Sequence, residues 1–160
     1  DDGRVLLYYR SNVADGIGLA IADHWRGPYE RVSDRPVLGV SDDRKVEDPF
    51  VWWNGWCYEM LAKDISGKIT GEVKAGVHFR SADGVDWTVC DNQKAYSRKV
   101  LWEDGSATIQ GCMERPQLLF DDNGEPSHLF VATGDGPGDF RHAINTWNLV
   151  VPLDASRRQG

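Results

Sequence analysis

Two short segments place carboxylates directly beside a proline and ahead of an apolar run. The first covers residues 46–53 and reads V-E-D-P-F-V-W-W, and the second covers residues 113–120 and reads M-E-R-P-Q-L-L-F. Both contain Glu-x-Pro followed by residues that favour strands or by an amide. Paired carboxylates are the groups that general acid and base catalysis requires, including the cleavage of glycosidic bonds. Glu47, Asp48 and Glu114 are therefore the first candidates for a reactive site.

The prolines in these segments indicate where the carboxylates should lie. Proline has no N–H to give to a β-ladder and is tolerated at the first position of a strand or along a free edge, and it favours an extended conformation in the preceding residue. We expect Pro49 and Pro116 to open two strands, with Asp48 and Arg115 extended before them. Such strands are typical of the innermost strand of a propeller blade, which lines a central channel. Asp48 and Glu114 would then meet at one mouth of that channel.

Length and composition describe one ordinary folded domain. The chain has 160 residues, of which 41% are hydrophobic and 27% charged, and its net charge is -7 at pH 7. An acidic chain is a poor match for nucleic acid or an anionic membrane, because both bind clustered Lys and Arg. No apolar run approaches the roughly 20 residues of a membrane-spanning helix. We expect a neutral or cationic ligand, with no nucleic-acid or membrane partner, and nothing in the sequence indicates a compartment.

Turn signals and β-prone runs alternate along the chain, and apolar residues nowhere keep helical spacing over three turns. The pattern predicts an all-β fold, namely a partial β-propeller of about two and a half to three four-stranded antiparallel blades. Residues 1–153 would form one propeller-like domain, with an incomplete blade at 1–40, a complete blade at 41–95, a third blade at 96–153 and a polar tail at 154–160. Because about five such repeats are needed to close a ring, we expect the chain to be the later part of a larger ring.

Cysteines and histidines show no metal-ligand spacing. Cys57, Cys90 and Cys112 leave one cysteine over from any disulfide, so we expect them to be reduced and buried. The four histidines are scattered, and His78 and His128 fall inside expected strands, where packing or solvent contact is the simpler interpretation. No metal ligand and no cofactor are predicted, although a cation such as calcium in the channel is left open.

Residues beside the candidate acids could contact a substrate. Trp53 offers a flat face for a sugar ring, and Arg115 and Glu47 are the other two residues expected to bind substrate. The alternative interpretation is structural. Tryptophan often fills the space between sheets, and the acids could simply form ion pairs with Arg44 and Arg115.

Together with G-L-A-I-A-D-H-W-R-G-P-Y at residues 18–29 and T-W-N-L-V-V-P-L at residues 146–153, these segments resemble the five-bladed β-propeller glycosidases. The chain is most similar to glycoside hydrolase family 43 and its uncharacterised relatives, over residues 1–153. The resemblance implies three acids from successive blades: an Asp base, an Asp that orients and tunes the pKa, and a Glu acid. Asp48 matches the second and Glu114 the third, whereas nothing in the sequence matches the base, which an earlier blade would supply.

Two functions are expected from these observations. The first is hydrolysis of O-glycosidic bonds of a neutral sugar, with Glu114 and Asp48 as catalytic residues. Because the base is not found in this sequence, the chain by itself could lack activity. The second is a non-catalytic module that binds carbohydrate or assembles with itself. Open blade edges favour homo-oligomers in either case. A sialidase-like or lectin propeller, suggested by the turn at residues 81–84, ranks last because no arginine triad is visible.

Overall fold

The computed structural model describes residues 3–11, 16–39, 45–137 and 140–153. These residues form strands and turns and no helix, so none of them belongs to a helix that could cross a membrane. The strands are β1 (Val5–Ser11), β2 (Gly16–Ala22), β3 (Glu30–Arg31), β4 (Val46–Trp53), β5 (Tyr58–Asp64), β6 (Gly76–Ser81), β7 (Thr88–Tyr96), β8 (Lys99–Leu101), β9 (Ala107–Ile109), β10 (Cys112–Phe120), β11 (Pro126–Gly134) and β12 (Thr146–Pro152).

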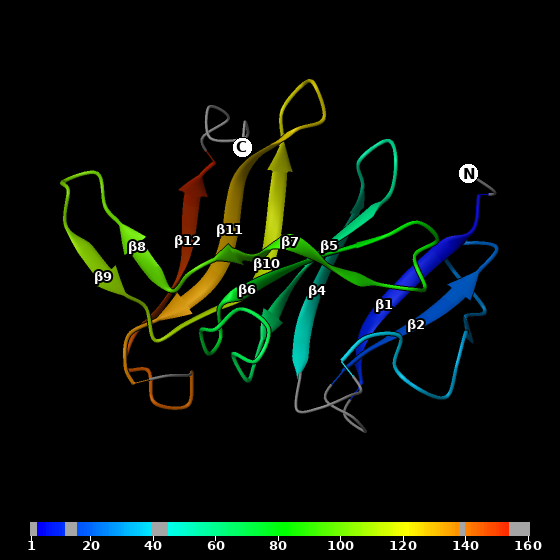
Figure 1. Ribbon diagram of the computed structural model, residues 1–160, viewed down its shortest axis with the longest axis horizontal. Coiled ribbons are helices and arrows are strands. Elements are labelled where there is room, and N and C mark those ends of the chain that lie inside the picture. Colours follow the sequence, from blue (N-terminus) through cyan, green and yellow to red (C-terminus); the bar gives the residue numbers. More distant parts are fainter. Residues whose placement is uncertain (1–2, 12–15, 40–44, 138–139, 154–160) are drawn as a thin grey trace.

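The strands form three antiparallel sheets and one two-stranded ribbon. The sheets have the strand orders β1-β2-β3, β4-β5-β6-β7 and β10-β11-β12, and β8 pairs with β9. Each sheet is a meander in which neighbours in sequence are neighbours in space. Figure 1 shows the sheets following one another across the molecule, from the blue β1–β2 through the cyan and green β4–β7 to the yellow and red β10–β12. The all-β, partial propeller arrangement expected from the sequence is therefore observed.

The middle sheet is a complete four-stranded unit, as the sequence predicts. Its first strand, β4, lies at the edge of the sheet and contacts both β1 and β10. The first strands of two neighbouring sheets, β4 and β10, thus lie side by side. The ribbon β8–β9 was not expected, because residues 91–110 have the composition of a polar connection.

The conformation expected around the two prolines is wrong. Pro49 and Pro116 do not open their strands but lie inside β4 and β10. Asp48 and Arg115 are not extended, since their φ angles are 58° and 53°, in the left-handed region. The physical reason is a bulge in each strand. Proline is tolerated at a bulge because its missing N–H is not needed there.

Both bulges have the same construction. In β4 the register runs from Glu47 opposite Lys63 to Phe50 opposite Leu61, so β4 carries one extra residue. In β10 the register passes from Glu114 opposite Ala132 to Gln117 opposite Phe130, again with one extra residue. A bulge bends its strand and re-aims the side chains beside it. The repeated Glu-x-Pro pattern therefore encodes a repeated bulge.

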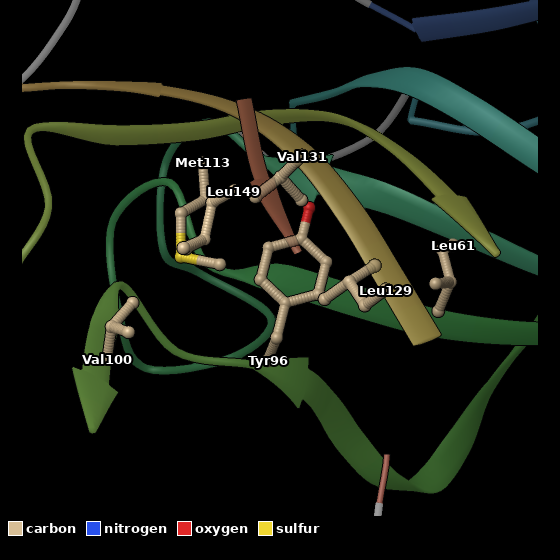
Figure 2. Packing of buried hydrophobic residues seen from close by; sticks show 7 residues of the cluster. All are labelled: Leu61, Tyr96, Val100, Met113, Leu129, Val131 and Leu149. Atoms are coloured by element: carbon tan, nitrogen blue, oxygen red, sulfur yellow. The ribbon is translucent and has the colours of Figure 1, made fainter. Parts of the chain in front are cut away.

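The middle sheet is covered on both faces. Alternate residues of a strand point to opposite sides, so Met60 and Ala62 of β5 join one apolar cluster, whereas Leu61 joins the other. Figure 2 shows the second cluster, in which the Tyr96 ring is surrounded by side chains of the third sheet. Its buried members are Leu61, Tyr96, Val100, Met113, Leu129, Val131 and Leu149. The two clusters hold the three sheets together.

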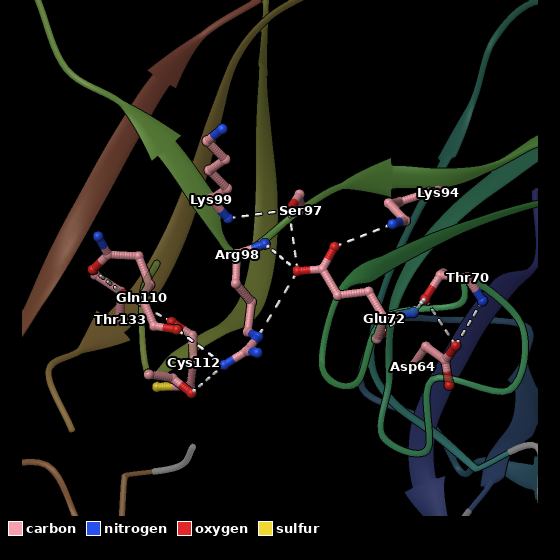
Figure 3. A network of polar contacts seen from close by, with 11 residues as sticks. Asp64, Thr70, Glu72, Lys94, Ser97, Arg98, Lys99, Gln110, Cys112 and Thr133 are labelled. Carbon is pink, nitrogen blue, oxygen red and sulfur yellow. Dashed lines mark hydrogen bonds and ion pairs between the residues drawn. The ribbon is translucent and has the colours of Figure 1, made fainter. Parts of the chain in front are cut away.

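A polar network centred on Glu72 adds a second connection between the middle and third sheets (Figure 3). Glu72 lies in the loop between β5 and β6 and accepts hydrogen bonds from the Ser97 hydroxyl at 3.0 Å and the Arg98 backbone N–H at 2.9 Å. The Arg98 guanidinium in turn donates to the carbonyl of Gln110 at 3.1 Å, just before β10. This network positions the start of β10, on which Glu114 lies.

Candidate active site

The two bulges bring Asp48 and Glu114 to one place between the middle and third sheets. The Asp48 carboxylate accepts a hydrogen bond from the backbone N–H of Arg115 at 3.3 Å, across the gap between the two strands. Glu114 immediately precedes Arg115 in the chain, and it is buried with only 8% of its surface exposed. The sequence prediction that these two acids converge thus agrees with the geometry.

The centre of the cluster is a lysine that sequence reasoning did not single out. The ammonium of Lys63, on β5, contacts Glu47 and lies 2.9 Å from Glu114 Oε1 and 4.0 Å from Asp48 Oδ2. Its side chain is 4% exposed. Lysine is rarely buried unless it is paired, so a Lys at the end of the apolar run M-L-A was the available signal. Arg10 of β1 contacts Glu47 from the other side.

Burial and charge act in opposite directions on the ionisable groups. Burial raises the pKa of Asp48, with a contribution from the negative charge of Glu47, and the Lys63 ammonium and the Arg115 N–H only partly oppose it. Burial by itself would lower the pKa of Lys63, but hydrogen bonds and charges from Glu47 and Glu114 outweigh it and raise the pKa. A carboxyl group with a raised pKa next to a buried cation is typical of functional sites, although ion-pair networks produce it too.

The Tyr96 hydroxyl is a further group at this place. Burial and the negative charges of Asp48 and Glu114 raise the pKa of Tyr96. Its oxygen is buried and has no hydrogen-bond partner among the described residues. A buried hydroxyl without a partner costs free energy, so this oxygen is suited to a water molecule or a ligand atom.

The three residues predicted to bind substrate lie in different places. Glu47 is in the cluster and is occupied by Lys63 and Arg10. Arg115 is adjacent to it, with its guanidinium 3.7 Å from Glu114 Oε2 and its side chain 65% exposed. Arg44, considered as an ion-pair partner, lies outside the described residues.

Trp53 lies at the far end of β4. It is the last residue of that strand and is 53% exposed. Its ring is edge-on to that of Tyr58, with the ring centroids 5.0 Å apart. A groove of about 330 Å³ runs along β4 from Pro49, next to Asp48, to Trp53. Its other lining residues are Leu6, Tyr8, Phe50, Val51, Trp52 and Tyr58. The tryptophan therefore belongs to an aromatic groove that reaches Pro49, the residue after Asp48, and that none of the candidate acids lines.

A larger groove of about 710 Å³ lies between the loop at residues 35–39 and the middle sheet. Its lining is mainly apolar and includes Val46, Phe79 and Trp87 but none of the candidate acids. Neither groove is lined by a candidate acid. The groove along β4 is the better candidate for substrate because its lining has more aromatic side chains.

The fold and the cluster define a class: an all-β chain of propeller-like sheets with an acid-rich, lysine-centred site between the first strands of two sheets. No protein-family model, curated protein or solved structure matches this chain.

Proposed function

We propose that the cluster is part of a glycoside-hydrolysing site that acts on O-glycosidic bonds of a neutral sugar. Glu114 would donate a proton to the leaving oxygen, Asp48 would set the local charge, and water would be the acceptor. One observation carries the proposal: Asp48 and Glu114 come from matching bulges in two different sheets and meet at one buried ammonium. This is the convergence of carboxylates that glycoside hydrolysis requires.

The groove along β4 supports a carbohydrate as ligand. It presents aromatic faces, including those of Trp53 and Tyr58, and it reaches Pro49, the residue that follows Asp48 in the chain. Aromatic faces suit the apolar face of a sugar ring, and a few convergent polar groups then orient it. The unpartnered Tyr96 hydroxyl would add one hydrogen bond close to the acids.

The test is hydrolysis of a panel of aryl arabinosides, xylosides, galactosides and fructosides with poor leaving groups. Wild-type protein should release the aryl alcohol from at least one of them, and Glu114→Gln should lower kcat by about 10² to 10⁴-fold, the usual contribution of general acid catalysis. Glu103→Gln is the matched control, because Glu103 is exposed and lies outside the cluster. Unchanged turnover in Glu114→Gln removes this residue from the role.

A second candidate function is a non-catalytic module that binds carbohydrate or assembles with itself. The observation in its favour is that the buried carboxylates already find cations within the chain: Glu47 contacts Lys63 and Arg10, and Glu114 contacts Lys63. This alternative predicts sugar binding by calorimetry, unchanged in Glu114→Gln, and no turnover of any substrate in the panel.

A further inference from the structure

A second cluster of reactive side chains lies on the same sheet, away from the acids around Lys63. Glu59 on β5, His78 on β6 and Cys90 on β7 each place one ligand-type atom within 4.8 Å of the others. Nε2 of His78 contacts Oε2 of Glu59. These residues are far apart in sequence, so no spacing rule for metal sites could have found them.

The sheet register explains why the three side chains meet. Glu59 lies opposite Arg80 and His78 lies opposite Leu61, so all four side chains share one face of the sheet. Arg80 lies opposite Thr88, and Cys90 follows two residues later on that same face. Three adjacent strands thus contribute one ligand each, which is a rigid support for a metal site.

Neighbouring side chains hold the three ligands in place. Asn54 donates a hydrogen bond to Glu59 Oε1 at 2.6 Å, which leaves Oε2 directed toward His78. The Trp52 ring stacks on the imidazole of His78, with centroids 5.9 Å apart and planes 8° apart. Such contacts orient metal ligands and raise affinity.

We propose that Glu59, His78 and Cys90 bind one zinc ion. Zinc accepts a mixed set of thiolate, imidazole and carboxylate ligands and needs four positions in tetrahedral geometry. The three side chains supply three of them, and the fourth is open to water. His78 is 27% exposed, so the metal has a path of entry from solvent.

Charge balance favours a divalent ion at this place. Zinc binding displaces the thiol proton of Cys90 to solvent, and the thiolate and the Glu59 carboxylate then neutralise the two charges of the metal. The Arg80 guanidinium now donates to Cys90 Sγ at 3.3 Å, but the arginine is exposed and can turn outward when the metal enters. Because protons compete for the ligands, affinity should fall as the pH decreases.

The experiment uses the reduced protein titrated with Zn²⁺ by calorimetry and with Co²⁺ as a spectroscopic probe. One equivalent of metal should bind, and the Co²⁺ form should show thiolate-to-metal charge-transfer absorption. Cys90→Ser should abolish that absorption, and His78→Gln should weaken binding by about 100-fold or more, at least as much as loss of a supporting contact. Cys112→Ser is the matched control because it removes a buried thiol from another sheet.

Three results would overturn the proposal. They are the absence of stoichiometric Zn²⁺ binding, a Co²⁺ spectrum without thiolate absorption, and equal affinity in wild type and His78→Gln. His78→Gln alters a partly exposed side chain, so it remains a usable variant if Cys90→Ser fails to fold.

Discussion

At the scale of single residues, the most constrained group is Lys63. It is almost fully buried, and its contacts are Glu47, Glu114 and, at 4.0 Å, Asp48. Removing one partner of a buried ion pair leaves uncompensated charge in a poorly solvated place. The same residue therefore determines both the stability of the cluster and the electric field at the proposed acid.

We expect Lys63→Met to lower the free energy of unfolding by about 3–5 kcal/mol, because three carboxylates then lack their shared cation. Urea denaturation at pH 7 measures this change in the free energy of unfolding. Lys68→Met, at an exposed position in the following loop, should change stability by less than about 0.5 kcal/mol. A stability loss in Lys63→Met no larger than in this control would contradict the central role of the lysine.

Asp48 should reduce stability at neutral pH. The pKa of Asp48 is raised in the folded protein, so its protonated form stabilises the fold. This stabilisation is fully present below the unfolded pKa, about 3.9, and is lost as the pH rises through the folded pKa. Asp48→Asn should therefore raise the melting temperature at pH 7, and the gain should disappear near pH 3. Asparagine also tolerates the left-handed φ at this position.

Thermal unfolding of wild type and Asp48→Asn between pH 3 and pH 8 provides the measurement, with Asp86→Asn as an exposed control. Under the proposed function the same variant should lose activity, because a group that costs stability is retained for its role. The expected gain in melting temperature over wild type is larger at pH 7 than at pH 3. A gain that is smaller at pH 7 than at pH 3 would refute the raised pKa of Asp48.

At the scale of elements, the Glu72 network connects the β5–β6 loop to the linker between β7 and β8. Burial by itself would raise the pKa of Glu72, but hydrogen bonds from the Arg98 N–H, Ser97 and Lys94 outweigh it and lower the pKa. The carboxylate form is therefore the one that connects these elements, and its effect on folding depends on pH.

We expect Glu72→Gln to reduce the free energy of unfolding by about 1.5–3 kcal/mol at pH 7, the usual contribution of hydrogen bonds to a charged group. Because the folded pKa is lowered, this stability is present above the unfolded value near 4.3 and is lost as the pH falls through the folded value. Denaturation at pH 7 and at pH 3 should show a difference between wild type and variant that shrinks in acid. Glu30→Gln, on exposed β3, should show no such difference.

At the scale of the whole molecule, the third sheet has one covered and one open face. Leu129 and Leu149 point into the core, whereas Leu119, Phe130 and Val150 on the opposite face are 51%, 37% and 47% exposed. The middle sheet packs against a neighbouring sheet on each of its two faces. Among the described residues, the third sheet packs against a neighbouring sheet on one face only. Apolar side chains grouped on one open face favour association.

We predict that this face pairs with a second copy of the chain. Light scattering should give a mass above that of one chain, and the double variant Leu119→Lys/Val150→Lys should shift the protein to a monomer because charge opposes burial of the face. Leu7→Lys, on β1 and 45% exposed, is the control. A monomer mass for the wild type over all concentrations would exclude the prediction.

The sequence by itself determined the strands of the three sheets, their grouping into meanders and the repeated Glu-x-Pro segments, because these depend on residues that are close together in the chain. It also identified Asp48 and Glu114 as acids that should meet. It did not indicate the ribbon β8–β9. Only the tertiary structure decided the conformation of Asp48 and Arg115, since a bulge depends on the register with the next strand. Lys63 likewise gains its role only when β5 pairs with β4 and contacts β10 of the third sheet.

The cluster of Glu59, His78 and Cys90 is the clearest case of the same limit. Each residue is unremarkable in its own strand, and the distances between them follow from the register of β5, β6 and β7. Local propensities specify which residues form strands, whereas long-range pairing specifies which side chains share a face. Chemistry that needs three strands at once is therefore decided by the fold.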